Sequence, residues 1–104
     1  MQIVVVNRHE YKGKDAVYVG RPSVLGNPYK LRGESSRTAV IEKYRQWLRN
    51  QWKQGGPAKW MLLWLVRSYR EDGQLVLVCS CVPKACHADV IRDAVLAICA
   101  KQGG

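Results

Sequence analysis

The sequence has no hydrophobic run long enough to cross a membrane: its longest, residues 60–66, is far shorter than a bilayer span. The first residues also lack the basic flank, apolar stretch and small-residue cleavage site of a secretory signal. No repeat, linker or low-complexity segment interrupts the 104 residues. Of these residues 47% are hydrophobic, which is enough for one modest core, and a chain of this length does not hold two domains. We therefore predict a single soluble α/β domain over residues 1–104, in the cytoplasm and without a membrane partner.

Acidic residues are scarce. Eight Asp and Glu stand against 17 Lys and Arg, which gives a net charge of +9. Such a surplus suits a nucleic acid, a phosphorylated small molecule or an acidic protein equally well. Residues 30–53 are especially basic, and Trp47, Trp52 and Trp60 lie within or near them. Either this segment follows phosphates and stacks bases, or Trp47 belongs to the core and the charges form a solvated helix face.

Local patterns predict the element order β-β-α-α-β-α. β-branched runs indicate the strands, and apolar residues at helical spacing indicate the helices. Consecutive apolar residues at 75–78 are typical of a strand buried on both faces, and therefore central in its sheet. The predicted fold is a compact domain with a small three-stranded, partly parallel sheet and about three helices. The strands are expected at residues 2–6, 16–19 and 75–78, and the helices from Arg37 to Gly55, from Pro57 to the turn at 71–73, and from beyond Pro83 to about Lys101.

The densest chemistry follows the third predicted strand, in the segment CSCVPKACHAD of residues 79–89. The carboxyl ends of central strands face the ligand crevice in open α/β sheets, and the first turn of the next helix offers free N–H groups. A helix N-terminus stabilises a thiolate and disfavours an imidazolium. Cys86 is therefore a candidate nucleophile and His87 a candidate neutral base, with Asp89 orienting His87 or capping the turn.

Two other interpretations of this segment stay open. Cys79, Cys81, Cys86 and His87 could bind zinc, because thiolates and one imidazole form a closed tetrahedral site, although the spacing differs from paired C-x-x-C knuckles. Alternatively, the cysteines are small buried residues and His87 is a helix-cap histidine. Helical spacing places Cys99 in the core. Without a secretory signal, we expect reduced thiols and no disulfide scaffold.

The loop after the second predicted strand, residues 20–28, is a candidate ligand-binding segment. Its glycines allow the backbone to approach a ligand closely, and its arginine can hold an anion with two hydrogen bonds. The candidate ligand-binding residues are Arg8, at the end of the first strand, and Gly20, Arg21, Ser23, Gly26 and Asn27 of the loop. Alternatively, the loop is a rigid turn in which Arg21 forms a salt bridge and Asn27 acts as a cap. Neither a G-x-G-x-x-G nor a Walker spacing is present, so the sequence supports neither standard phosphate loop.

Four segments together resemble one family: VVNR, YVGRPSVLGNPY, YRQWL and CSCVPKACHADV. They are similar to a small bacterial and bacteriophage domain of unknown function with the motifs G-R-x-S-x-x-G-N-P-[FY] and C-x-C-x-P-x-x-C-H. The resemblance extends from Val5 to about Val95. Ser80 departs from it, because family members often carry an aromatic residue between the first two cysteines. The resemblance implies that the two motifs belong together and that the protein acts in a phage or mobile-element context, in the host cytoplasm if a phage encodes it.

The leading functional hypothesis is a phage-type accessory domain that binds or processes a nucleotide, a nucleoside or a related phosphorylated compound where the two motifs meet. A reaction type does not follow from these residues. The alternatives are a basic nucleic-acid-binding module with a possible zinc site, and a protein that binds and inhibits an acidic host protein.

Overall fold

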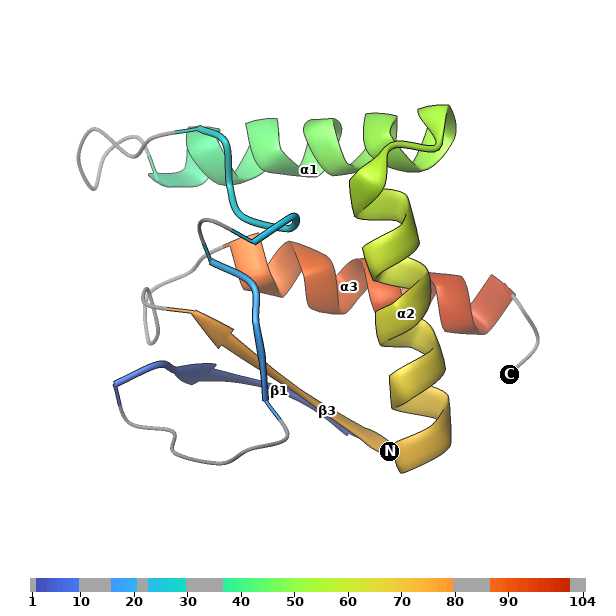
Figure 1. Ribbon diagram of the computed structural model, residues 1–104. Helices are drawn as coiled ribbons and strands as arrows, with labels where there is room; N and C mark the ends of the chain where they lie inside the picture. The colour runs from blue at the N-terminus through green and yellow to red at the C-terminus, as the bar shows by residue number, and fades with distance from the viewer. Residues whose placement is uncertain (1, 10–15, 21–22, 30–36, 80–86, 102–104) are drawn as a thin grey trace.

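A computed structural model describes residues 2–9, 16–20, 23–29, 37–79 and 87–101 of the chain. The observed order of elements confirms the prediction, as does the α/β fold class (Figure 1). The elements are β1 (Gln2–Asn7), β2 (Ala16–Tyr18), α1 (Arg37–Gln54), α2 (Pro57–Asp72), β3 (Gln74–Cys79) and α3 (His87–Lys101).

The sheet has the order β1-β3-β2, and both neighbours are parallel to β3. Leu77 and Val78 point to opposite faces of β3, and both are buried, which confirms the predicted central strand. In register, Asn7 lies opposite Cys79 and Tyr18 opposite Val78. Because all three strands run the same way, their carboxyl ends lie at one edge of the sheet.

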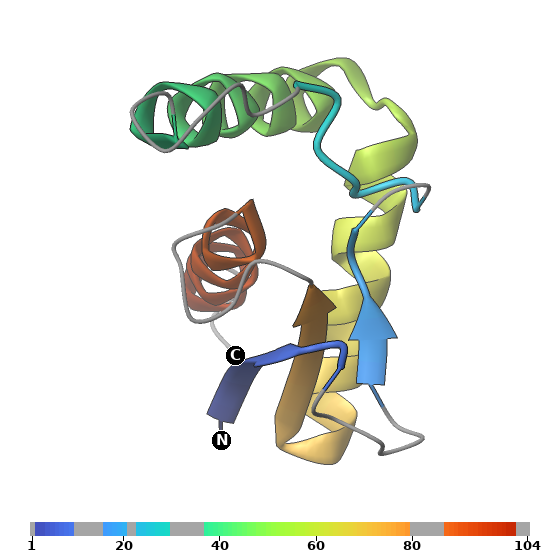
Figure 2. The ribbon, with the colours of Figure 1, turned by 90° about the vertical axis from the view of Figure 1, so that its left-hand side faces the viewer.

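The three helices surround one core. Figure 1 shows α1 and α3 running in the same direction, with α2 crossing both, and in Figure 2 α3 lies between α1 and β1. The amphipathic spacing of each helix supplies the buried side chains, since one stripe faces inward. The largest fully buried side chains come from the loop after β2 and from every helix and the central strand: Tyr44, Leu25, Leu62, Leu65, Leu77, Ile91, Val19, Val95 and Cys79.

Glycines at both ends of α2 set its direction. Gly55 and Gly73 adopt left-handed backbone conformations, with φ of +71° and +75°, which residues with a side chain rarely adopt. The Gly73 N–H donates to the carbonyl of Tyr69 at 2.9 Å and ends the helix. At the start of α2, Pro57 has no backbone N–H that would need a partner. The next N–H, of Ala58, donates a hydrogen bond to Gln51 Oε1 at 3.3 Å. The predicted breaks are therefore confirmed.

Two predicted core positions are also confirmed. Trp47 is partly buried and packs against the core, with its ring centroid 5.4 Å from that of Tyr44. Cys99 packs against the core from α3. Among the described residues, no helix is both long and apolar enough to cross a membrane.

Candidate functional site

The carboxyl edge of the sheet brings parts of the two sequence motifs together. The backbone N–H of Arg8 donates to the carbonyl of Cys79 at 3.0 Å, and that of Val19 donates to Val78 at 3.0 Å. These bonds extend the parallel pairing just past the ends of β1 and β2. Arg8 and Gly20 therefore lie at the same edge as Cys79. Arg21, Cys81 and Cys86 lie outside the described residues.

His87 joins the two motifs directly. It is the first residue of α3 and is only 7% exposed. Its Nε2 lies 2.6 Å from the carbonyl oxygen of Val19, the residue before Gly20. Because a carbonyl oxygen can only accept a hydrogen bond, Nε2 carries the proton and is the donor. The imidazole ring thus ties the start of α3 to the end of β2, over 68 residues of sequence.

Tyr44 supports this bond from α1. Its ring meets the His87 ring edge-on, with centroids 5.0 Å apart and an interplanar angle of 66°. Its hydroxyl donates to the carbonyl of Leu25 at 2.7 Å, and this bond is buried. A buried bond of this kind is costly to leave unmade, so Tyr44 fixes the loop after β2 against the first helix.

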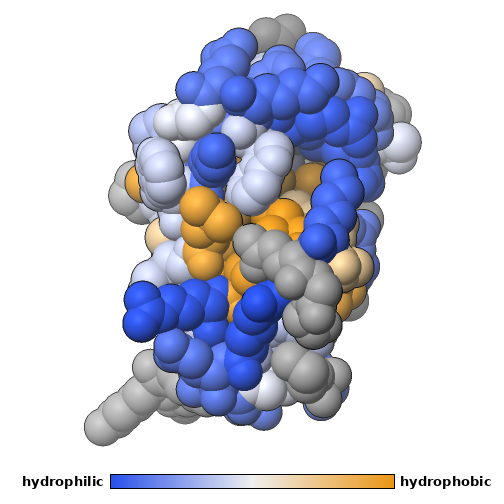
Figure 3. All heavy atoms as spheres, turned by 90° about the vertical axis from the view of Figure 1, so that its right-hand side faces the viewer, coloured by the Kyte–Doolittle hydropathy of each residue, from blue (hydrophilic) through white to orange (hydrophobic). Residues whose placement is uncertain are grey.

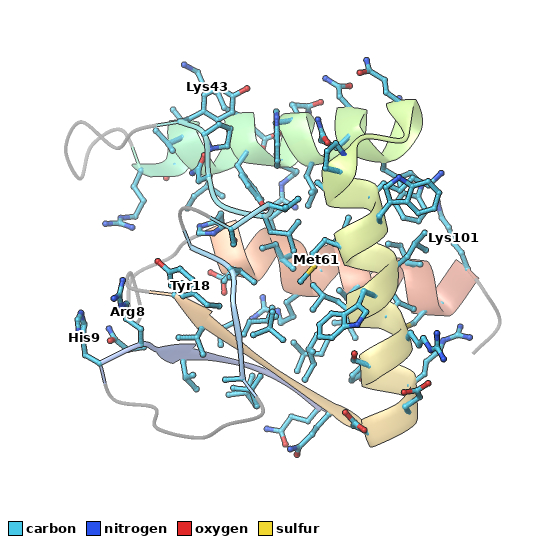
Figure 4. All side chains as sticks on the ribbon, viewed as in Figure 1. Arg8, His9, Tyr18, Lys43, Met61 and Lys101 are labelled. Atoms are coloured by element: carbon cyan, nitrogen blue, oxygen red, sulfur yellow. The ribbon has the colours of Figure 1, made fainter. Side chains whose placement is uncertain are left out.

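Arg8 is held at the edge by an aromatic side chain. Its guanidinium carbon lies 5.4 Å from the centroid of the Tyr18 ring, and Nη1 donates to the Tyr18 hydroxyl at 3.4 Å (Figure 4). A Cβ at Gly20 would overlap the hydroxyl end of the same ring, so the Tyr18 side chain would have to shift to admit a larger residue there. Arg8 is exposed, and no carboxylate pairs with it in the described part of the chain. The edge therefore presents an oriented cation.

Hydrogen-bonded turns hold the described part of the loop, Gly20 and residues 23–29. Ser23 N–H donates to the Gly20 carbonyl at 2.9 Å, and Gly26 N–H donates to the Ser23 carbonyl at 2.9 Å. Asn27 Oδ1 accepts from the backbone N–H of Tyr29 at 2.9 Å. The Asn27 oxygen therefore holds the turn, which agrees with the alternative interpretation of Asn27 as a cap, and its assignment to ligand binding stays a prediction.

Ser23 retains unused hydrogen-bonding capacity within this loop. Its Oγ is buried and makes no hydrogen bond within the residues that the structure describes. A buried hydroxyl without a partner is uncommon and calls for an explanation such as a ligand or an ordered water. Ser23 therefore stays among the predicted ligand-binding residues, together with Gly20 and Gly26.

Asp89 lies in the first turn of α3, on its partly exposed side. Its Oδ1 is 3.5 Å from Nη1 of Arg92, which also approaches Asp93 at 3.4 Å. Such exposed pairs contribute little to stability. The proposed catalytic roles of Cys86, His87 and Asp89 stay predictions.

Cys79 and His87 are the two members of the predicted zinc set that the structure describes. Cys79 is a buried cysteine at the end of β3. Within the described ranges no three His, Cys, Asp or Glu side chains form a metal-binding group. The zinc hypothesis also requires Cys81 and Cys86, so it stays a prediction.

Two residues of this site were not predicted from the sequence. The sequence pattern places Tyr18 in a strand and Tyr44 in the apolar stripe of a helix, and it assigns neither a contact with the site. A signal for Tyr18 is present, since an aromatic residue two positions before a glycine at a strand end can lie over that glycine. Tyr44 has no such local signal, since its partners at Leu25 and His87 are distant in sequence.

No curated protein and no solved structure matches the chain significantly. One family profile does match, over residues 4–97, and it is described as a domain of unknown function (DUF4326). Because this match covers nearly all of the 104 residues, the chain belongs to the DUF4326 family.

Proposed function

We propose that the carboxyl edge of the sheet binds a small phosphorylated ligand of the nucleotide class, with Arg8 contacting its phosphate. The observation that carries this proposal is the His87–Val19 hydrogen bond, which joins the two motifs beside an exposed arginine without a carboxylate partner in the described residues. The carboxyl ends of parallel strands are where α/β sheets bind ligands. A phage or mobile-element context, implied by the motif resemblance, is compatible with such a ligand.

Arg8 suits a phosphate because a guanidinium offers two parallel N–H donors and stays charged. Its contact with Tyr18 and the backbone bond to Cys79 restrict its position before a ligand arrives. In a nucleotide, the base could contact the Tyr18 ring while the phosphate contacts the Arg8 guanidinium beside it. The Ser23 hydroxyl, which makes no hydrogen bond to any residue the structure describes, and Arg21 are expected to add further contacts.

The proposal assigns binding to this edge and leaves catalysis open. His87 donates its Nε2 proton to Val19, so its part in the proposal is to position the end of β2. A reacting role would have to come from Cys86 or from the second ring nitrogen. We therefore test binding first.

The test is isothermal titration of AMP, ATP, adenosine and inorganic phosphate into the purified protein at constant ionic strength. A charge-assisted hydrogen bond contributes about 1.5–3 kcal/mol, so Arg8→Gln should weaken binding of the phosphorylated probes roughly 10- to 150-fold. Arg70→Gln is the matched control, because it removes the same charge from the last turn of α2, next to the start of β3. The proposal fails if no probe binds at millimolar concentration, or if both variants bind alike.

A further inference from the structure

The outward face of α2 carries two exposed tryptophans. Trp60 and Trp64 lie one helical turn apart and are 63% and 51% exposed. The opposite face of the helix makes the core contacts, through Ala58, Leu62, Leu65, Val66 and Tyr69. Large aromatic side chains gain most from burial or stacking, and exposed aromatic patches mark interaction sites. This face therefore has the character of a binding surface.

A lysine connects Trp60 to a groove. Lys59 Nζ lies 5.6 Å from the Trp60 ring centroid and 5.2 Å from that of Trp52. Trp52 in turn lines a groove of about 440 Å³ between α1, α2 and α3. Figure 3 shows a hydrophobic hollow on this side of the molecule, bordered by hydrophilic side chains. We call Trp52, Lys59, Trp60 and Trp64 the tryptophan face.

The charges around this surface are mostly positive. Arg45, Arg49 and Lys101 line the groove, against one acid, Asp93. Arg49, Lys59 and Lys101 pair with no acid in the described parts of the chain, whereas the acids Glu42 and Glu71 are matched by arginines on their own helices. The surface therefore complements a negatively charged partner.

The arrangement of rings and cations favours one kind of anion. Residues four apart on a helix rise by about 6 Å, so Trp60 and Trp64 can each take one base of an unstacked strand, whereas a duplex holds bases about 3.4 Å apart per strand. Aromatic rings alternating with cations are the usual means of binding single strands without reading their sequence. A lipid surface or an acidic peptide would not need two separated flat rings.

We propose that the tryptophan face binds single-stranded nucleic acid, with Trp60 and Trp64 stacking on bases and Lys59, Arg49 and Lys101 contacting phosphates. This site is distinct from the carboxyl edge of the sheet and uses none of its residues. It extends the sequence-based expectation of a nucleic-acid partner, which names Trp60 but not Trp64.

The experiment measures fluorescence anisotropy of a labelled oligothymidylate of about 12 nucleotides, a length within the site sizes of known single-strand binders. Trp60→Ala and Trp64→Ala should each weaken binding about 5- to 150-fold, because each removes a stacking platform and no charge. Leu96→Ala is the matched control, since Leu96 is an exposed apolar residue of α3 outside the groove lining. It should leave binding unchanged.

Lys59→Gln gives a second test, which removes one charge and keeps both tryptophans. It should lower the slope of log affinity against log salt concentration by about one. Circular dichroism and thermal unfolding of each variant check that the fold is retained. The proposal is overturned if both tryptophan variants bind the oligonucleotide as well as the unchanged protein. It is also overturned if poly-glutamate or phosphatidylserine-containing vesicles bind more tightly than the oligonucleotide and with the same loss in Trp60→Ala.

Discussion

Replacing His87 tests whether this residue is a structural link between the two motifs. His87→Ala removes the donor to the Val19 carbonyl and the edge contact with Tyr44. Leaving a buried acceptor unsatisfied costs about 1–3 kcal/mol, and an aromatic edge contact contributes about 0.5–1.5 kcal/mol. We therefore expect the free energy of unfolding to fall by about 2–4 kcal/mol. For a domain of this size the melting temperature should drop by about 8–30 °C.

The assay is guanidinium unfolding followed by circular dichroism and tryptophan fluorescence. His87→Gln is the informative companion, because its side-chain amide can still donate to Val19. It should therefore lose less stability than His87→Ala. The reasoning is refuted if His87→Ala stays within about 0.5 kcal/mol of the unchanged protein, which is the range of ordinary surface substitutions. Equal losses in both variants would show that the hydrogen bond is not the cause.

Two further substitutions test the links around the site and the fold. Tyr44→Phe leaves the Leu25 carbonyl without its buried donor and should cost about 1–3 kcal/mol in chemical denaturation; no measurable loss would contradict this role. The Cβ of Gly73→Ala meets no atom within 4 Å, so its cost of about 1–2 kcal/mol should come from the left-handed backbone alone, and an unchanged unfolding midpoint would contradict that. The control for both is Gln46→Ala on the exposed side of α1, which should leave stability unchanged.

Local signals in the sequence were sufficient for the fold. Consecutive apolar residues at 75–78 predicted a central strand because only a strand with neighbours on both sides and helices on both faces buries every side chain. Pro57 and Gly73 predicted the ends of α2 through their backbone preferences, which act within a few residues. The parallel pairing of β2 with β3 is consistent with the long connection between them, which carries α1 and α2, since adjacent parallel strands need a crossover of a dozen or more residues.

The interactions of the candidate site could not be predicted in the same way. The sequence places His87 at a helix start, but its bond to Val19 depends on how α3 packs against the end of β2. Likewise, whether the Asn27 oxygen faces a ligand or its own loop depends on the turn that the loop adopts. Both outcomes depend on tertiary packing, which produces no periodic pattern in the amino-acid sequence.

Trp64 is a different kind of omission, because its signal is present in the sequence. Treating the apolar stretch 60–66 as one buried block hides it, since a helix buries a single stripe of its surface. Extending the helical spacing from Leu62 and Leu65 to Tyr69 places Trp60 and Trp64 on the opposite side.

The two proposed sites can be tested separately because different elements carry them. Arg8 follows β1 at the carboxyl edge of the sheet, whereas Trp60 and Trp64 lie on the outward face of α2. Arg8→Gln should therefore leave oligonucleotide binding almost unchanged, apart from the loss of one charge from +9. The tryptophan variants should bind nucleotides normally. If instead each substitution impaired both ligands equally, a single extended surface would be the better explanation, with α1 as the element that contacts both regions through Tyr44 on one side and Trp52 on the other.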